Sequence, residues 1–446
     1  MRLSRLTRIL TVALATVMLA ACGGNSGNSG SSGGSSGGPV TLTWFMWSGS
    51  DVEKDAWLHV ADMVTQKYPN IKIEFQTTPF NDYWTKLTTQ AASGSTPCVI
   101  GLQGQRAPQF GSLLVPLDDY MSKAGVKAED YVPSITKGLQ LDNKQVALPY
   151  DVGPLVVFYN KDAFKAAGLD PNKPPVTWAE VALAAAKLKA AGQKCPFTTS
   201  WISWTQLESF SAWHNVEFAT KGNGMNGSDA RLVFNSPLHV RHIQDLENMA
   251  KQGLFVYKGR ENKADTTFPS GECAMLTGSA GLLGNIKKNA KFNYGVAPLP
   301  YYEDVAGAPQ NTVIGGASLW VMSGKPADHY KGVASFFNYL SSPEVQSESH
   351  KRTGYLPITT AAFKLTEQSG YYKQNPGADV AVNQMIRKTT DKSRGIRLGN
   401  FLQIRTIIDE ELEQVWAGKA TAKQALDKAV ARGNEQLEKF QAANKS

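Results

Sequence analysis

The stretch that decides the fold runs from Thr41 to Gln103. It begins with TLTWFMW (41–47), an apolar run typical of a buried strand, and continues with IKIEFQ (71–76), which alternates apolar and polar residues as a half-buried strand does. Between them, 52–67 places apolar residues at helical spacing, while 83–93 and 98–103 read as a further helix and strand. Strands alternating with helices at this spacing predict a mostly parallel α/β sheet.

The same pattern returns further along the chain. Strands are expected at 154–159, 293–297 and 311–322, and helices at 161–167, 178–191, 329–340, 344–351, 404–416 and 422–440. The 408 residues after position 38 exceed one average core and suggest two lobes. We therefore predict an α/β fold with two lobes and a ligand cleft between the carboxyl ends of strands.

The first 38 residues differ in kind from the rest. Arg2, Arg5 and Arg8 precede a short apolar run and the small residues before Cys22, which is the pattern of a secretory signal peptide over 1–21. The sequence ending at Cys22 resembles a lipobox, which implies cleavage before this cysteine and lipid modification of its thiol. Residues 23–38 contain only Gly, Ser and Asn and are typical of a flexible tether. We expect an extracytoplasmic, lipid-anchored protein; an ordinary signal peptide with an incidental cysteine is the alternative.

Charge and cysteines narrow the classes of function. The formal charge is +8, and no block of five like charges occurs, so a nucleic-acid partner is not expected. After Cys22, three cysteines remain (Cys98, Cys195 and Cys273), so at most one intramolecular disulfide can form. No CxxC motif supports a zinc or redox site.

Catalytic and cofactor motifs are missing from the sequence. None of the six histidines forms HExxH; His239 and His242 are spaced for one helical face, but we expect solvated surface histidines there rather than a metal pair. The GxGxxG at 222–227 does not follow a predicted strand and reads as a loop. Nothing marks a carboxylate pair for hydrolysis. We therefore expect no enzyme activity, no cofactor and no metal.

The candidate binding groups are aromatic, glycine and arginine residues. Aromatic faces stack on sugar rings and alkyl chains, although about half of them should pack in the core. Gly315-Gly316 follows a predicted strand, where glycines permit close approach of an anion to the backbone, and Arg397 lies in a tight loop before a helix, where a guanidinium can bind phosphate. The aromatic candidates are Trp44, Trp47, Tyr83, Trp84, Tyr150, Trp201 and Trp204.

Several long motifs resemble one family. They include YNKDAF (159–164), QLESFSAW (206–213), GECAM (271–275), IGGASLWVM (314–322), TGYLPIT (353–359) and RLGN (397–400). The chain after residue 38 resembles the extracytoplasmic solute-binding proteins of carbohydrate ABC importers, and its second half is closest to their glycerol-3-phosphate-binding branch. The resemblance implies a two-lobe clamp with a hinge that closes on its ligand and delivers it to the transmembrane subunits of a permease.

The resemblance also implies individual contacts. It places a ligand-stacking tryptophan at Trp201 or Trp204 and a lobe-one tyrosine at Tyr83, and it pairs Cys195 with Cys273. The groups on the phosphate side would be Ser279, Gly316, Tyr355 and Arg397. We expect lobe one to comprise 39–151 plus 296–340, lobe two to comprise 152–295 plus 341–446, and the protein to be a monomer.

The first half departs from the branch. Gln103-Gly104-Gln105 stands where the branch has a ligand-binding glutamate, and Asp151, within YDVG (150–153), stands where it has a serine pair. Asp151 is therefore expected to accept hydroxyl hydrogen bonds. The expected ligand is glycerol 3-phosphate or a glycerophosphodiester; a neutral mono- or oligosaccharide is the alternative within the class. An extracellular hydrolase and a structural or adhesive lipoprotein are the alternatives from other classes.

Overall fold

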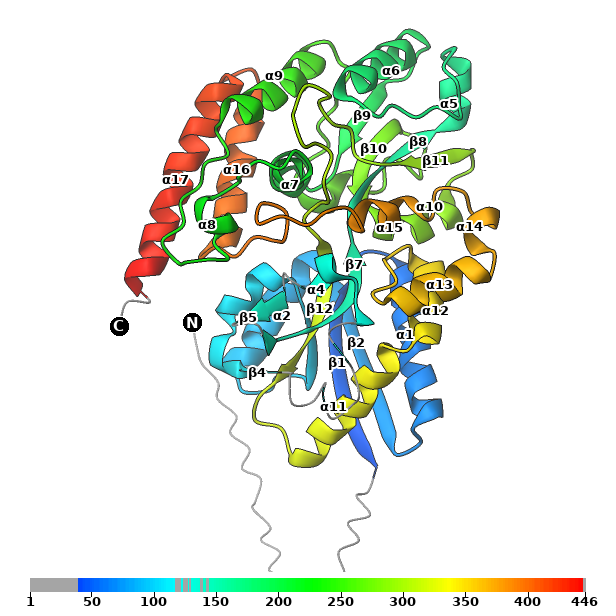
Figure 1. The fold of residues 1–446 in the computed structure, drawn as a ribbon, viewed down its shortest axis with the longest axis vertical. Coiled ribbons are helices and arrows are strands. Elements are labelled where there is room, and N and C mark those ends of the chain that lie inside the picture. Colours follow the sequence, from blue (N-terminus) through cyan, green and yellow to red (C-terminus); the bar gives the residue numbers. More distant parts are fainter. Residues whose placement is uncertain are drawn as a thin grey trace, which may run out of the picture. The chain divides into compact units, whose positions relative to one another are not determined.

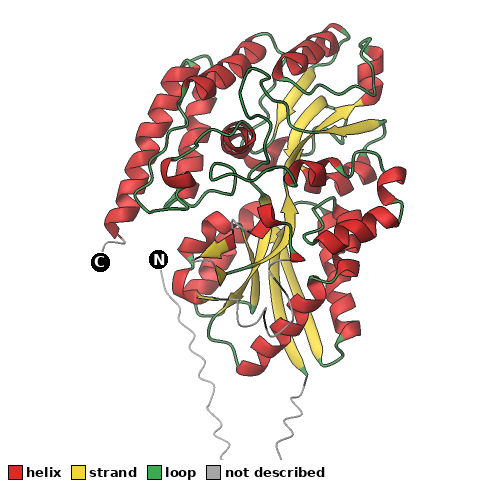
Figure 2. Ribbon diagram, in the orientation of Figure 1, coloured by secondary structure: helices red, strands yellow, loops and turns green. Residues whose placement is uncertain are grey.

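A computed structural model describes residues 39–443 except 117–121, 123–126, 128–129, 137–138 and 142–143. The predicted signal peptide, the predicted lipidation site Cys22 and the tether lie outside the described residues. Two larger sheets organise the described part, each covered by helices (Figures 1 and 2).

The first sheet contains six strands in the described residues, with the order β2-β1-β3-β12-β4 and with β7 paired to β12. Strand β1 pairs in parallel with β2 and β3, whereas β12 is antiparallel to β3, β4 and β7. The prediction of a mostly parallel sheet therefore holds only for its first three strands. The elements of this lobe are β1 (Val40–Ser48), α1 (Asp51–Lys67), β2 (Ile71–Pro79), α2 (Phe80–Ala92), β3 (Val99–Leu102), β4 (Leu114–Val115), α4 (Pro133–Thr136), β7 (Leu148–Gly153), β12 (Gly315–Met322) and α11 (Ala327–Leu340).

The second sheet has the order β11-β8-β10-β9. Strand β8 is antiparallel to both of its neighbours, while β9 and β10 run parallel. The residues of β8 from Leu155 to Tyr159 are all buried, so both faces of this central strand are covered. The elements are β8 (Leu155–Asn160), α5 (Lys161–Ala166), α6 (Trp178–Ala190), β9 (Cys195–Thr199), α7 (Ser209–Trp213), α8 (Thr220–Asn223), α9 (Pro237–Lys251), β10 (Cys273–Ser279), α10 (Leu283–Asn289), β11 (Tyr294–Ala297), α16 (Phe401–Trp416) and α17 (Ala422–Ala443).

The chain passes between the two sheets more than once. It crosses at Gly153–Leu155, where β7 ends and β8 begins, and returns between β11 and β12. Helix α12 (Pro343–Thr353) contacts α1 of the first lobe, and α13 (Thr360–Gln368), α14 (Tyr371–Gln374) and α15 (Val380–Met385) follow it. The exact lobe boundaries stay a prediction, but these crossings provide the connections that a hinge requires.

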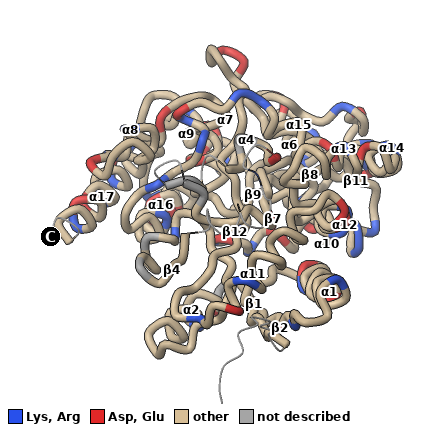
Figure 3. The backbone as a smooth tube through the Cα atoms, turned by 60° about the horizontal axis from the view of Figure 1, so that its bottom comes forward, with Lys and Arg blue, Asp and Glu red and all other residues tan. Residues whose placement is uncertain are grey.

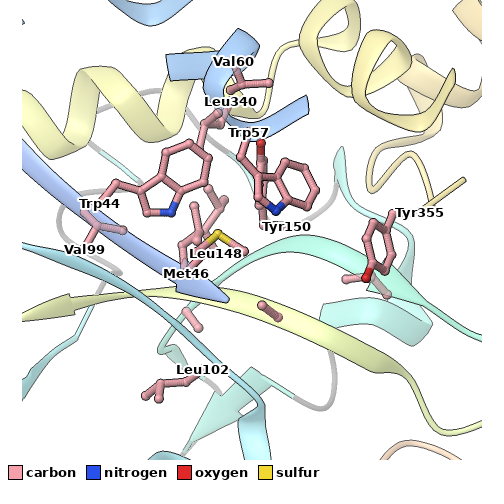
Figure 4. Packing of buried hydrophobic residues seen from close by; sticks show 14 of the residues in the cluster. Trp44, Met46, Trp57, Val60, Val99, Leu102, Leu148, Tyr150, Leu340 and Tyr355 are labelled. Atoms are coloured by element: carbon pink, nitrogen blue, oxygen red, sulfur yellow. The ribbon is translucent and has the colours of Figure 1, made fainter. Parts of the chain in front are cut away.

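Buried aromatic residues fill the core of the first lobe (Figure 4). Trp44 is fully buried, with ring centroids 4.9 Å from Phe75, 5.5 Å from Tyr150 and 5.4 Å from Phe336. Trp44 and Tyr150 are therefore core residues and belong to the half of the aromatic candidates that we expected to pack. Burial of such side chains stabilises the fold by about 2 kcal/mol each.

Charged residues of both signs are mixed along helix α17, as Figure 3 shows. Lys423 and Asp427, for example, form an ion pair one turn apart. Within the described residues, no helix has the length and apolarity needed to span a bilayer.

Candidate functional site: a cavity lined by both lobes

A cavity of about 530 Å³ lies between residues of the two lobes. This volume suits a small organic ligand. Glu53 and Phe80 line it from the first lobe, and Trp201, Trp204 and Ser279 line it from the second. The cavity therefore has the position that the sequence predicted for a ligand cleft.

Two tryptophans form an aromatic wall. Trp201 has a φ of 52°, a conformation that costs a non-glycine residue free energy, and its ring meets the ring of Phe80 edge-on with centroids 4.9 Å apart. Trp204 donates a hydrogen bond from its indole Nε1 to the Val313 carbonyl at 3.1 Å. A Cβ at Gly315 would lie 2.4 Å from the Trp204 ring, so the glycine lets β12 approach this indole. Both rings are thus held in fixed positions on the cavity surface.

Glu53 and Tyr355 form a buried hydrogen-bonded pair. The Tyr355 hydroxyl donates to Glu53 Oε1 at 2.7 Å, and the Gly49 amide donates to Glu53 Oε2 at 2.5 Å. Glu53 lies in the first turn of α1, which Ser50 caps by accepting a hydrogen bond from the Glu53 amide. Burial raises the pKa of the Glu53 carboxyl, although its hydrogen bonds oppose this effect.

Asp265 adds a second carboxyl group from the other lobe. It follows the short helix at Glu261–Ala264, ahead of β10, and lines the cavity. Its Oδ1 atom is buried and has no hydrogen-bond partner among the described residues. Burial raises the pKa of Asp265 to about 7, and the charge of Glu53 contributes to the rise. The Ser200 side chain forms a hydrogen bond with the Asp265 carboxyl, which opposes this rise, so Oδ1 is the oxygen left for a ligand to satisfy.

Positive groups reach the cavity from the C-terminal part of the chain. Arg394 and Arg397 come from the loop before α16, and Arg405 comes from α16 itself. The backbone amide of Arg397 donates to the Asn223 carbonyl at 2.9 Å, which ties this loop to α8. Arg405 donates two hydrogen bonds, of 2.8 and 2.6 Å, to the buried carboxylate of Glu208. An arginine in such a wall can bind a carboxylate or a phosphate.

The structure brings together six of the predicted site residues. They line the cavity and are Trp201, Trp204, Ser279, Gly316, Tyr355 and Arg397. Gly316 has a φ of 88°, and a Cβ there would lie 1.7 Å from the Asp151 carbonyl oxygen. This glycine is thus required for the close approach of β12 to β7, whatever else it contacts.

Tyr83 and Asp151 are placed differently from our expectation. Neither residue lines the cavity. Tyr83 is fully buried, with its hydroxyl 2.8 Å from the Gly101 carbonyl and 3.0 Å from the Phe45 carbonyl, so that it braces β1 and β3. Asp151 is also buried, and its Oδ1 accepts a 2.6 Å hydrogen bond from the Ala317 amide. Their polar atoms hold strands in place, which is why they are not at the cavity surface.

Five charged lining residues were not predicted from the sequence: Glu53, Glu208, Asp265, Arg394 and Arg405. Glu53 follows Ser50 by three residues, a spacing that by itself indicates only a helix cap. Asp265 lies in a polar segment that carries no motif. In both cases the functional signal is burial, and burial arises from contacts between distant parts of the chain.

The histidine expectation was wrong. His239 and His242 are buried on α9 instead of solvated on the surface. His239 lies within hydrogen-bonding distance of two serine hydroxyls, and His242 Nε2 lies 2.9 Å from the side-chain oxygen of Gln206. Burial lowers the pKa of His239 to about 3. Among the described residues, no group of three His, Cys, Asp or Glu side chains is arranged to hold a metal ion.

The three described cysteines, Cys98, Cys195 and Cys273, are not among the residues that line the cavity. The structure forms a disulfide between Cys195 and Cys273, the pair that the resemblance implied, and it links the starts of the neighbouring strands β9 and β10. Cys98 is a buried free thiol, and burial raises its pKa to about 11. Such a thiol is unreactive at neutral pH.

The chain is similar to glycerol-3-phosphate-binding proteins. It is 46% identical over 398 residues to the sn-glycerol-3-phosphate-binding periplasmic protein UgpB of Salmonella typhimurium, covering 86% of this chain and 91% of the relative. It is 48% identical over 362 residues to UgpB of Escherichia coli O1:K1, covering 79% of this chain and 82% of the relative.

Solved structures share the fold at lower identity. UgpB from Mycobacterium tuberculosis in complex with glycerophosphocholine has a TM-score of 0.76 and 22% identity, over 90% of this chain and 99% of that one. The cyclic alpha-maltosyl-1,6-maltose binding protein from Arthrobacter globiformis has a TM-score of 0.72 and 23% identity, over 90% of this chain and all of that one. These neighbours show the two-lobe α/β fold. Residues 59–379 match the family model described as bacterial extracellular solute-binding protein, and the chain belongs to this family.

Proposed function

We propose that this protein is the solute-binding component of an ABC importer and that it captures glycerol 3-phosphate or a glycerophosphodiester without transforming it. The identity of 46–48% to UgpB proteins supports the ligand class. The observation that carries the proposal is a cavity whose wall combines Arg397 with the indoles of Trp201 and Trp204. A guanidinium suits a phosphate, and an indole face suits the carbon chain of a small alcohol.

Delivery of the ligand would follow from closure of the two lobes. A ligand that contacts both lobes favours the closed state over the open one. The Phe80–Trp201 contact joins the lobes beside the cavity and is the kind of contact that closure makes. The partner would be the transmembrane permease subunits, and a lipid on Cys22 would hold the monomeric protein at the outer face of the membrane.

The proposal is tested by titration calorimetry of the purified protein against glycerol 3-phosphate, glycerophosphocholine, maltose and trehalose. Binding of either phosphate compound is expected. Arg397→Ala should lose this binding, while Arg352→Ala, which removes a surface arginine paired with Glu348, should keep it. Unchanged affinity in Arg397→Ala would refute the role of that side chain. Binding of the neutral sugars alone would replace the ligand class with saccharides.

A further inference from the structure

The cavity wall contains an acidic region that a phosphate ligand does not explain. Glu53 reaches it from α1 and Asp265 from the segment before β10. Burial and the charges of both carboxyl groups raise the pKa of the Tyr355 hydroxyl, and the charge of Glu53 adds to the effect of burial in raising the pKa of Asp265. Residues from both lobes therefore concentrate negative charge around Tyr355.

One carboxyl oxygen in this region, Asp265 Oδ1, has no hydrogen-bond partner among the described residues. Both Glu53 oxygens accept hydrogen bonds from the protein, one from Tyr355 and one from Gly49. Ser200 forms a hydrogen bond with the Asp265 side chain, but Asp265 Oδ1 is buried and has no partner in the part of the chain that the structure describes, and Asp265 lines the cavity. An acceptor removed from water without a donor is unfavourable, so a ligand that supplies a donor here gains affinity.

The chemistry of this region selects the part of the ligand that fits. A phosphate oxygen carries negative charge and offers no proton, so ionised carboxylates repel it, as Asp265 does above its pKa of about 7. A hydroxyl group donates a hydrogen bond, and one to a charged acceptor is stronger than one between neutral groups. The hydroxyl groups of a glycerol unit therefore fit beside Glu53 and Asp265, and the phosphate fits beside the arginines of the loop before α16.

We infer that Glu53 and Asp265 are specificity-determining residues that bind the hydroxyl groups of the ligand's glycerol unit. This inference rests on the proposed function and deepens it. Tyr355, which the resemblance assigned to the phosphate side, then orients the Glu53 carboxylate instead of binding phosphate directly. The protein distinguishes a polyol phosphate from an alkyl phosphate through this acidic region.

The test compares glycerol 3-phosphate with propyl phosphate, which has the same chain length and no hydroxyl group. Calorimetry of the purified protein at about pH 8, where Asp265 is ionised, should show glycerol 3-phosphate binding tighter by roughly 10- to 100-fold, the range of hydrogen bonds to charged groups. In Asp265→Asn and in Glu53→Gln, this ratio should fall at least about threefold, while propyl phosphate binds as well as before or better. Asp328→Asn, which changes an exposed carboxyl far along the chain in α11, should leave the ratio unchanged.

The possible outcomes distinguish failure of this inference from failure of the proposed function. Equal binding of both compounds by the unchanged protein overturns the inference and leaves the proposed function standing. A preference for glycerol 3-phosphate that persists undiminished in both variants also overturns the inference. Binding of neither compound overturns the inference, and if glycerophosphocholine also fails to bind, the proposed function is overturned as well. Unfolding curves of the variants, measured in parallel, establish that any lost ratio comes from a folded protein.

Discussion

The replacement Asp265→Asn should change how the stability of the ligand-free protein depends on pH. Burial, helped by the charge of Glu53, raises the pKa of Asp265 from 3.8 to about 7 in the folded chain. In the unfolded chain the carboxyl loses its proton near its ordinary pKa of about 3.9. Between about pH 4 and pH 7, the folded state therefore holds a proton that the unfolded state has released. Stability falls with rising pH wherever the folded state binds more protons, so this carboxyl destabilises the protein increasingly across that window.

The magnitude follows from the two pKa values. Each tenfold difference in proton affinity is worth about 1.4 kcal/mol, so Asp265 lowers the free energy of unfolding by at most about 4 kcal/mol between pH 4 and pH 8. Asparagine does not titrate. The free energy of unfolding of Asp265→Asn, taken relative to the unchanged protein, should therefore rise by up to this amount across the window and level off above about pH 7.

Urea unfolding at a series of pH values, followed by tryptophan fluorescence, measures this difference. Titrating groups that do not interact with Asp265 cancel, so the difference reports Asp265 together with its interaction with Glu53. Asp328→Asn is the matched control, because its carboxyl is exposed and its pKa is lowered by His329. Parallel stability curves for Asp265→Asn and the unchanged protein would refute the assignment of a raised pKa to Asp265.

Three further predictions follow from buried contacts, all read from urea unfolding. Glu208→Gln leaves the half-buried Arg405 guanidinium without its carboxylate partner and should cost about 3 kcal/mol. Glu348→Gln, in an exposed ion pair, should cost less than about 1 kcal/mol. Equal losses would contradict the argument from burial. Gly316→Ala should cost at least about 2 kcal/mol because of its clash, and Gly94→Ala, which has a similar φ of 70° but open space around it, should cost about 1 kcal/mol; similar costs would show that strain alone decides. Cys195→Ala removes the disulfide that closes a loop of 78 residues and should cost about 4 kcal/mol. Equal unfolding midpoints for the variant and the unchanged protein, both without reductant, would show that the bond does not stabilise the fold.

The helices and strands were largely predictable because their signals are local. Strand β1 was expected at 41–47 and is Val40–Ser48, and the helix expected at 52–67 is Asp51–Lys67. Strand direction was not predictable in the same way. The alternation of apolar residues is the same for parallel and antiparallel strands, and nothing local in β12 shows that it returns from the second lobe to pair antiparallel with β3.

The residues of the candidate site were likewise predictable only in part. Trp201, Trp204 and Arg397 were expected in it, because each lies in a recognisable loop or motif, and all three line the cavity. Tyr83 and Asp151 were expected there too, but their polar atoms bond to the backbone of the first sheet. A sequence pattern shows which residues are able to bind a ligand, whereas the packing of distant strands decides which of them face the cavity.

Asp265 belongs to no sequence motif, but its surroundings in the structure give the strongest indication of a ligand contact. Asp265 lies in a loop without a motif, yet its carboxyl is buried beside another acid, with an oxygen that no described residue satisfies. Folding alone gains nothing from this arrangement, since asparagine at the same place would remove the charge at little cost in volume. A carboxyl that destabilises the empty protein and lines its cavity is best accounted for by a bound state in which a ligand hydroxyl donates to it. The opposite effects expected of Asp265→Asn, a gain in stability near neutral pH and a loss of preference for glycerol 3-phosphate, are therefore two measurements of one property of the cavity.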